Sequence, residues 1–495
     1  MNIIPTLNEK CKGAMISFAI GDALGWPNER RTTNVAYNKN YLSQFKAWKK
    51  KAGGRYWSHN ENILAGEYSD DTQIMLAIAR SLLSGLKWDE YFVKYELPFW
   101  RYYERGGGSA VLRAASQWEH DIAPWQDKEK EKYYFAGGNG VAMRIIPHVI
   151  INLAKNNFDI IAEEIVKDAI LTHGHPRAVL GALCYAYALY YCFKKTTTLQ
   201  YGELVVELLQ NNEKWCVFPG YIKEDWLTVA NGFYSYKKVW NDTVNHIIES
   251  LKKIKTSVEL GVLDVEIETL SALGCFDKNI NGAGDIAAVV SIYFASKYAN
   301  NPALGIKQAA NAFGADTDTI AAMTGGLLGS LNGLDWLPYE WKIVQDYNCI
   351  ELMAEYLLDE NGSKFLKDYI ANKKQDDTWI RLSIGKAKYV KEENIPCGKT
   401  GQVLITKYLT VLGQSIYLKE YHREKNKKQV NRNEILKINR TKLKQMILDD
   451  ASCDISLLLL IKILELKQEG NSVIEIANGL QLNVELINKL LNIVS

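Results

Sequence analysis

The sequence lacks closely spaced cysteine pairs. Its eight cysteines stand at positions 11, 184, 192, 216, 275, 349, 397 and 453, and no two of them form a CxxC unit. This spacing excludes a compact zinc knuckle built from cysteine pairs. Scattered cysteines of this kind are typical of reduced, mostly buried thiols.

Long apolar runs and an excess of one charge are lacking as well. No stretch reaches the roughly 18 apolar residues of a membrane span, and residues 1–10 do not combine a basic segment with an apolar one as a secretory leader does. We therefore expect a cytoplasmic protein without a membrane partner. The net charge of +2 over 495 residues indicates neither nucleic acid nor a membrane surface.

Helical periodicity is what the first three quarters of the chain do contain. Apolar residues recur at helical spacing from about residue 10 to 370, and Gly- or Asn-rich breaks separate the segments. We predict one all-α domain over residues 10–370. Strand patterns are few, and the best of them, residues 403–406, also fits a short helix. The clearest predicted helices are 12–24, 72–83, 178–193, 286–298 and 303–313.

Residues 371–495 have a different character. Residues 419–444 contain ten Lys or Arg against three Glu, a run that usually forms a solvated helix face. Residues 472–491 have helix-turn-helix spacing, but the face that would enter a DNA groove has a single positive charge, Lys489, which indicates a weak DNA reader. We expect a small, mainly helical tail domain. DNA binding, binding of a protein partner and dimerisation are all open as its role.

Two short runs of acids and hydroxyls carry the strongest functional signal: Ser-Asp-Asp-Thr at 69–72 and Asp-Thr-Asp-Thr at 316–319. Each run opens an apolar, Ala-rich segment, so its carboxylates should lie at a helix N-terminus. Helix capping is the simpler interpretation, because Ser, Thr and Asp are favoured caps. A cap needs one oxygen, however, and each run supplies several. Two such runs brought together would form an oxygen-only cage for Mg²⁺ or Mn²⁺.

Five motifs, taken in order, resemble the ADP-ribosylglycohydrolases, whose bacterial prototype is the dinitrogenase-reductase-activating glycohydrolase. The resemblance covers about residues 10–345. It implies a multi-helix orthogonal bundle and an enzyme that removes ADP-ribose from modified targets with a two-metal site. The motifs are Gly21-Asp22-Ala23-Leu24-Gly25 with Glu29, Tyr68-Ser69-Asp70-Asp71-Thr72, Gly138-Asn139-Gly140-Val141-Ala142-Met143-Arg144, Thr172-His173-Gly174-His175-Pro176 and Gly314-Ala315-Asp316-Thr317-Asp318-Thr319-Ile320-Ala321.

The resemblance implies two Mg²⁺ or Mn²⁺ ions held by both acid runs, with Asp316 bridging them and Asp22 supporting the ligands from behind. Two such ions could hold adjacent ribose hydroxyls and polarise a bound water. The implied ligands are Ser69, Asp70, Asp71, Asp316, Asp318 and Thr319.

Cleavage of the glycosidic bond also requires a carboxylate that takes a proton from water or steadies the developing cation. Glu29 matches the family's mobile glutamate and is the first candidate, with Asp70 or Asp71 as the alternative. A surface acid paired with Arg30 and Arg31 is the other interpretation of Glu29.

Backbone N–H groups of Gly138, Asn139 and Gly140 would meet the pyrophosphate, because glycines leave the backbone accessible. His173 and His175 flank the substrate in the family. By themselves, two histidines at this spacing could form a structured helix entry or satisfy the backbone. They have no third nitrogen or sulfur ligand nearby in sequence, so they do not indicate zinc.

Three positions depart from the family pattern. Ala315 stands where relatives usually have a second glycine, and Ser69 replaces a threonine but keeps its hydroxyl. Gly137 stands where some relatives place an aromatic that stacks on adenine, so Phe135 or Tyr134 would have to supply that ring. All predicted metal-binding oxygens are present, and we expect an active enzyme.

Two hypotheses of function result. The first is a metal-dependent hydrolase that cleaves the bond between ADP-ribose and a modified protein or nucleic acid. The alternative is an ADP-ribose-sensing regulator whose tail binds DNA or a protein. A lesser option is hydrolysis of a small free nucleotide conjugate. The linkage cleaved (arginine, serine or nucleobase), the choice between Mg²⁺ and Mn²⁺, and the oligomeric state are left open.

Overall fold

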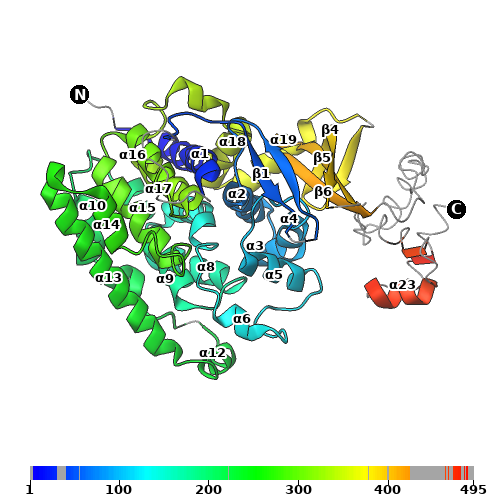
Figure 1. Ribbon diagram of the computed structural model, residues 1–495, viewed down its shortest axis with the longest axis horizontal. Coiled ribbons are helices and arrows are strands. Elements are labelled where there is room, and N and C mark those ends of the chain that lie inside the picture. Colours follow the sequence, from blue (N-terminus) through cyan, green and yellow to red (C-terminus); the bar gives the residue numbers. More distant parts are fainter. Residues whose placement is uncertain are drawn as a thin grey trace. The chain divides into compact units, whose positions relative to one another are not determined.

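The computed structural model is built mainly from helices, with two small sheets (Figure 1). The chain divides into two compact units. The helical unit comprises Met1–Lys51, Asn60–Lys373 and Leu412–Tyr417, and the C-terminal unit comprises Ala52–His59, Lys374–Val411 and Leu418–Ser495. The structure describes residues 4–29, 41–54, 56–220, 222–376, 378–398, 401–423, 463, 466, 467, 472–480, 484, 487 and 488.

The helical unit confirms the predicted all-α fold of residues 10–370. Each of the predicted helices is present, and most extend a few residues further than the periodicity indicated. Its helices are α1 (Leu7–Gly25), α2 (Asp70–Leu83), α3 (Trp88–Tyr91), α4 (Leu97–Trp100), α5 (Ser109–Trp118), α6 (Lys130–Tyr134), α7 (Ile146–Asn152), α8 (Phe158–Ile170), α9 (Pro176–Lys194), α10 (Glu203–Gln210), α11 (Glu213–Cys216), α12 (Glu224–Asn231), α13 (Tyr236–Leu260), α14 (Glu266–Ala272), α15 (Gly284–Tyr298), α16 (Pro302–Ala310), α17 (Thr317–Asn332), α18 (Tyr347–Leu358) and α19 (Gly362–Asn372).

Glycines bring the backbones of α1 and α17 into close contact at the centre of this unit (Figure 1). A Cβ atom on Gly21 would lie 2.0 Å from the carbonyl oxygen of Ala321, and one on Gly25 would lie 2.1 Å from that of Thr317. No side chain fits between the helices at these positions. The contact therefore places the C-terminal end of α1, which carries Asp22, beside the N-terminal end of α17.

Short segments connect these helices near the predicted site. The 3-10 turn η1 (Trp26–Asn28) continues α1 toward Glu29, and η3 (Ala142–Arg144) follows the Gly138–Val141 loop. Strands β1 (Trp48–Ala52) and β2 (His59–Ile63) form a two-stranded sheet that the sequence did not predict. The remaining short turns are η2 (Phe92–Glu96, a π-helical turn), η4 (Leu153–Lys155), η5 (Gly261–Leu263) and η6 (Tyr339–Ile343).

A four-stranded antiparallel sheet corrects our expectation of a mainly helical tail from residue 371. Strands β3 (Trp379–Leu382), β4 (Gly385–Cys397), β5 (Gly401–Thr410) and β6 (Ser415–Arg423) follow one another in that order. The register of β4 on β5 runs from Ala387 opposite Thr410 to Cys397 opposite Gly401. The best strand pattern of the sequence, residues 403–406, lies within β5. The other strands were missed because a strand is stabilised by partners across the sheet rather than by local periodicity.

The predicted helix-turn-helix is described only in part. Its first helix is α23 (Val473–Leu480), and Ser472 and Glu475 form reciprocal hydrogen bonds of 2.7 and 3.2 Å at its start. Such a capping box marks a helix N-terminus. Most of the second predicted helix and most of the basic run lie outside the described residues.

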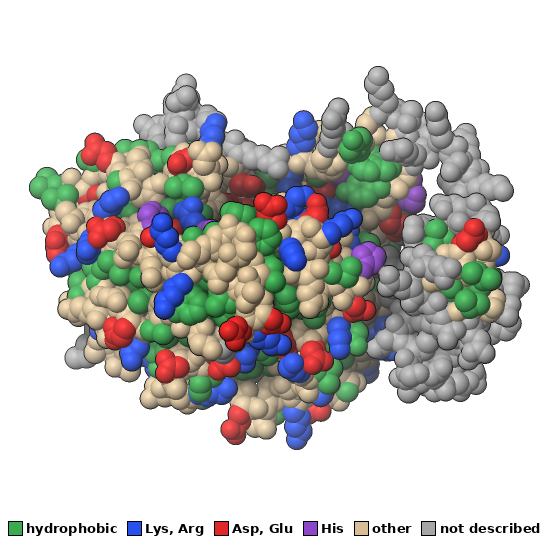
Figure 2. Space-filling model, turned by 90° about the horizontal axis from the view of Figure 1, so that it is seen from below, with side chains coloured by type: hydrophobic (Ala, Val, Ile, Leu, Met, Phe, Trp, Pro, Cys, Tyr) green, Lys and Arg blue, Asp and Glu red, His purple; other side chains and the backbone are tan. Residues whose placement is uncertain are grey.

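Charged side chains of both signs are interspersed over the described surface that Figure 2 shows, in agreement with the small net charge. The seven described cysteines are free, and all but Cys216 are buried. In the part of the chain that the structure describes, no helix combines the length and the apolar character needed to cross a bilayer.

Candidate active site

The first acid run begins α2, as the sequence predicted. The Ser69 hydroxyl is the cap and accepts a hydrogen bond of 3.2 Å from the N–H of Asp71. Asp22 of α1 accepts bonds from the N–H groups of Ser69 (2.9 Å) and Thr72 (3.0 Å), so it supports this helix start as expected. Because Ser69 and Asp22 satisfy the helix N-terminus, the carboxylates of Asp70 and Asp71 are not needed as caps.

The second acid run begins α17. Asp316 occupies the cap position, but in the described structure its side chain makes no capping hydrogen bond. Its Oδ2 instead accepts a bond of 2.8 Å from the side-chain amide of Asn139. The neighbouring Thr317 hydroxyl donates to the carbonyl of Gly25 (2.9 Å), which fixes the helix start against α1.

The fold brings the two runs together. Helices α2 and α17 contact each other, and Asp71 of α2 lies near Asp316 and Thr319 at the start of α17. Burial raises the pKa of Asp71 well above its ordinary value, and the nearby carboxylates of Asp70, Asp22 and Asp316 raise it further. Asp71 Oδ2 is buried and has no hydrogen-bond partner among the described residues. A buried carboxylate oxygen in this situation is costly unless a cation compensates it.

Glu29 lies near both runs. It follows η1, and its carboxylate is among the groups that raise the pKa of Asp318, after burial, which is the largest cause. It also contributes to the raised pKa of Asp70, where burial again dominates. The structure thus places the predicted catalytic glutamate beside the predicted metal ligands. Arg30 and Arg31, its alternative partners, lie outside the described residues.

The acids are neighbours without forming a ready-made coordination shell. Among the described residues, no group of three or more His, Cys, Asp or Glu side chains is gathered closely enough to hold an ion. Like charges repel at short range, so the neighbouring carboxylates disfavour the ionised form of each acid.

A glycine-rich loop forms one wall beside Asp316. Gly138 pairs with Ala283 in an isolated antiparallel bridge, and the N–H of Asn139 donates to the carbonyl of Gly282 (3.0 Å). A Cβ atom on Gly282 would lie 3.3 Å from Asp316 Oδ2. The absence of a side chain on Gly282 therefore lets this wall lie close to Asp316.

The two predicted histidines have different surroundings. His173 is 2% exposed, its Nδ1 lies 2.8 Å from the Thr172 hydroxyl, and burial lowers its pKa to about 3. His175 caps α9 through a bond of 3.2 Å from the N–H of Arg177, and burial lowers its pKa to about 4. Both imidazoles are therefore neutral at pH 7. Helix entry, one of the two roles open to this pair, belongs to His175.

Arg144 is an anchor of the loop whose contacts the sequence did not show. Its guanidinium is fully buried, pairs with Asp168 (Nε to Oδ2, 2.9 Å) and donates to the carbonyl of Gly140 (3.0 Å). It also donates to the Thr172 hydroxyl (2.9 Å). One side chain thus fixes the glycine loop and the residue that holds His173.

Phe135 is the aromatic ring available beside Gly137. Its side chain is 54% exposed and contacts the rings of Phe233 and Tyr234. Tyr134 is fully buried, and its hydroxyl donates to the carbonyl of Trp226 (3.1 Å). Of the two candidates, only Phe135 presents an accessible face.

Two charged residues near Asp70 were missed by the sequence interpretation. After burial, Glu104 is the largest contributor to the raised pKa of Asp70, while Lys50 of β1 lowers that pKa. Nothing local distinguishes Lys50 from its neighbours Lys49 and Lys51, so sequence alone offered no signal for it.

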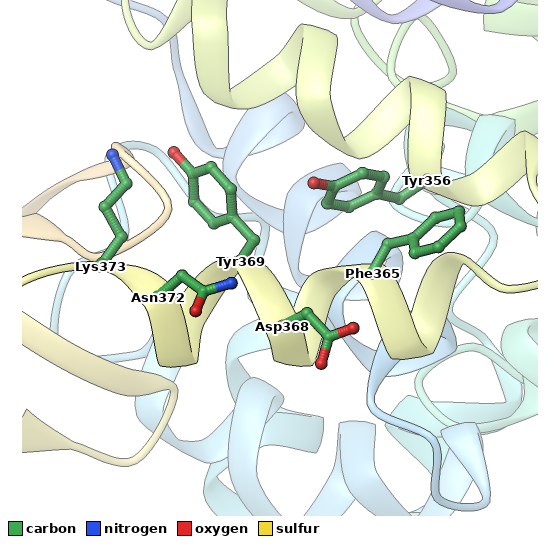
Figure 3. Close-up of a pocket in the computed structure, with 6 residues that line it drawn as sticks. All are labelled: Tyr356, Phe365, Asp368, Tyr369, Asn372 and Lys373. Carbon is green, nitrogen blue, oxygen red and sulfur yellow. The ribbon is translucent and has the colours of Figure 1, made fainter.

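The hollow in Figure 3 lies away from these residues. It has a volume of about 400 Å³ and lies between α18 and α19. None of the predicted site residues lines it, so the candidate site rests on chemistry rather than on the presence of a hollow. The lining residues are Tyr356, Phe365, Asp368, Tyr369, Asn372 and Lys373.

Comparison with known proteins finds several similar proteins. The chain is similar to ADP-ribosylhydrolase ARH3 of Danio rerio (24% identity, 67% of this chain and 85% of that protein). It is also similar to the ADP-ribosyl-[dinitrogen reductase] glycohydrolase of Rhodospirillum rubrum (27% identity, 35% of this chain and 54% of that protein). A solved structure, an ADP-ribosylglycohydrolase-related protein complex, aligns over 71% of this chain and 98% of its own with a TM-score of 0.45 and 19% identity.

The model of one protein family, described as ADP-ribosylglycohydrolase, matches residues 4–366, well over half of the chain. This range contains both acid runs, Glu29, the glycine loop and the two histidines. The chain therefore belongs to the ADP-ribosylglycohydrolase family.

Proposed function

We propose that the protein is a metal-dependent hydrolase that cleaves the glycosidic bond between ADP-ribose and a modified macromolecule. The observation that carries the proposal is the convergence of the two acid runs, which brings Asp71 of α2 near Asp316 of α17. Family membership supports the reaction class, and the oxygen-only set of side chains supports metal dependence.

The oxygen donors of the two acid runs are of the chemical type that hard divalent cations prefer. The ligands in this proposal are Ser69, Asp70, Asp71, Asp316, Asp318 and Thr319. Asp71 Oδ2, which is buried and has no hydrogen-bond partner in the described part of the chain, is the kind of oxygen that such a cation would satisfy. When bound, two Mg²⁺ or Mn²⁺ ions would neutralise these carboxylates and lower the pKa of a bound water.

Glu29 is the proposed general base. A water oxygen bonds to the anomeric carbon of the ribose while the bond from that carbon to the modified group breaks. Glu29 takes a proton from the water, and the departing group keeps the bonding electron pair and takes up a proton. The closeness of Glu29 to Asp70 and Asp318 supports this assignment over that of a solvated surface acid.

The glycine loop and the histidines are the proposed ADP-ribose contacts. Gly138 and Gly140 offer a backbone without obstructing side chains. The N–H of Asn139 already donates to Gly282, so the contribution of Asn139 is its side chain, which orients Asp316 by a 2.8 Å bond. His173, neutral and held by Thr172, can hydrogen-bond the substrate without adding charge. Phe135 is the proposed ring for adenine.

The test is release of free ADP-ribose from arginine-, serine- and DNA-linked substrates in the presence of Mg²⁺, Mn²⁺ or EDTA. We expect metal-dependent release from at least one linkage. Asp316→Ala should lower kcat/KM by about 100-fold or more, as the loss of a major electrostatic group does. The matched control is Asp359→Ala, an exposed carboxylate of the same unit that caps a turn at Asn361, which should retain full activity.

No release from any linkage by a folded wild type that binds Mn²⁺ would contradict the proposal. Tight binding of free ADP-ribose without release would favour the alternative function of an ADP-ribose-sensing regulator.

A further inference from the structure

A short C-terminal segment belongs to the helical unit although it lies outside residues 4–366, which the family model matches. This segment is Leu412–Tyr417, the turn before β6 and the start of that strand. All of its residues are buried except Gly413, which is half-buried. This degree of burial indicates that the segment is part of the core of the unit and not a surface loop that only connects two elements.

The segment holds the residues that lead into the first acid run. The Tyr417 hydroxyl donates to the carboxylate of Glu67. The N–H of Ser415 donates to Asp346 Oδ2 (2.8 Å), and the same oxygen accepts the hydroxyl of Tyr68 (2.5 Å). Glu67 and Tyr68 directly precede Ser69, so both of these bonds act within a few residues of the α2 N-terminus.

Arg105 connects the same segment to the opposite side of Asp70. Its guanidinium is 3% exposed, pairs with Glu67 at 2.9 Å and lies 4.1 Å from the centre of the Tyr417 ring. The residue after it, Gly106, has φ +139°, and a Cβ atom there would lie 2.9 Å from Asp70 Oδ1. The backbone of Gly106 beside Asp70 therefore follows directly on Arg105, whose guanidinium contacts the Tyr417 ring.

Arg105 also reaches the segment that carries the proposed base. Its guanidinium lies 5.5 Å from the ring of Trp26, the first residue of η1, which leads to Glu29. The segment before the first acid run and the segment before Glu29 thus meet at one buried ion pair. Groups that orient metal ligands from behind typically change metal affinity by 10- to 100-fold when they are mutated.

We propose that Tyr417 is a positioning residue of the active site, which acts on Asp70 and Asp71 through Glu67 and Arg105. The part of the inference that concerns metal affinity rests on the proposed function; the part that concerns loop order does not. The segment Leu412–Tyr417 accordingly contributes one buried aromatic side chain within the helical unit, and a truncation at residue 366, where the family match ends, removes it.

The test compares three variants of the full chain. Tyr417→Leu removes the hydroxyl and the ring over Arg105, and Tyr417→Phe removes only the hydroxyl. The matched control is Tyr421→Leu on the same strand, whose ring contacts Trp57 and His59 of the C-terminal unit. Mn²⁺ affinity is measured by calorimetry with MnCl₂ alone, and amide hydrogen exchange is measured without metal over residues 64–72 and 104–110.

We expect Tyr417→Leu to weaken Mn²⁺ binding by about 10- to 100-fold and to speed exchange in both segments. Tyr417→Phe should show a smaller change in the same direction, and it decides the question if Tyr417→Leu does not fold. Tyr421→Leu should match the wild type. Steady-state kinetics at saturating Mn²⁺ should recover most of the lost kcat, which a general loss of folded protein would not allow.

Wild-type exchange rates and Mn²⁺ affinity in a folded Tyr417 variant would overturn the inference. A wild type that binds no Mn²⁺ would instead refute the proposed function, and the exchange measurement would still decide whether Tyr417 orders the two segments. Equal effects from Tyr421→Leu would show that the whole strand acts, and not Tyr417, and would also overturn the proposal.

Discussion

Replacement of Arg144 by methionine should destabilise the protein strongly. Arg144 and its partner Asp168 are both fully buried, and the guanidinium donates to the side chain and the carbonyl of Asp168, to Gly140 and to Thr172. Methionine fills much of the volume but leaves the Asp168 carboxylate buried without its counter-charge. Breaking a buried pair in this way typically costs about 3–5 kcal/mol.

A second substitution separates the loss of packing from the unpaired charge. Arg144→Met combined with Asp168→Leu removes both charges, and apolar replacements of buried ion pairs are often neutral or stabilising. The carbonyl of Gly140 and the Thr172 hydroxyl still lose a donor, at about 1–3 kcal/mol. We therefore expect the double variant to be about 2 kcal/mol more stable than Arg144→Met alone.

Urea unfolding, followed by circular dichroism and tryptophan fluorescence, measures these differences where both signals coincide. The control is Arg101→Met, since Arg101 pairs with Glu119 at the surface, where both side chains are about a third exposed. Its cost should stay below about 1 kcal/mol. A cost below about 1 kcal/mol for Arg144→Met, or a double variant no more stable than the single one, would refute the reasoning.

Three further predictions concern stability. Gly21→Ala should lower the free energy of unfolding by about 1–3 kcal/mol or more, because its Cβ would lie 2.0 Å from the carbonyl oxygen of Ala321. Urea unfolding measures this loss, and an unchanged midpoint would contradict the close contact. Burial alone would raise the pKa of Asp264, but Lys297 at 2.7 Å and nearby hydroxyls lower it to about 2. The ionised Asp264 carboxylate should therefore contribute about 2 kcal/mol to the free energy of unfolding above pH 4, and this contribution should be lost as the pH falls from about 4 to about 2. Urea unfolding midpoints of the wild type and of Asp264→Asn, measured across that pH range, would show this loss. Midpoints of the two proteins that change in parallel with pH would disprove it. Asp71→Asn should raise the stability of the metal-free protein by on the order of 1 kcal/mol, because burial and three neighbouring acids disfavour the charge of Asp71. The same variant should lose Mn²⁺ binding. A variant that is less stable and still binds Mn²⁺ would contradict both expectations.

The acid site and the fold make opposite demands on the same residues. Asp70, Asp71 and Asp318 all have pKa values raised by burial and by neighbouring carboxylates, so their charged forms weaken the metal-free fold. Stability is commonly sacrificed at functional sites in this way. The glycine contacts between α1 and α17 and the Arg144 anchor hold the surrounding backbone against this repulsion.

Local patterns in the sequence were enough to predict the helices and the two helix starts that carry acids. A helix forms through contacts three and four residues apart, and a cap lies within one turn, so both are readable from a short stretch. The motifs that contain Asp22 and Gly138 also lie in contacts of the folded chain. Asp22 accepts a hydrogen bond from the N–H of Ser69, and Gly138 pairs with Ala283.

The tertiary structure alone decided which residues that are far apart in the chain come into contact. The bond from Asn139 to Asp316, the pair of Arg144 with Asp168 and the cover of Arg105 by Tyr417 join residues that no local pattern links. The sheet of residues 379–423 belongs to the same class, because each strand depends on its neighbours for hydrogen bonds. Sequence thus determined which side chains begin each helix, whereas folding determined which of them meet, because a charge–charge or hydrogen-bond contact depends on distance in space and not along the chain.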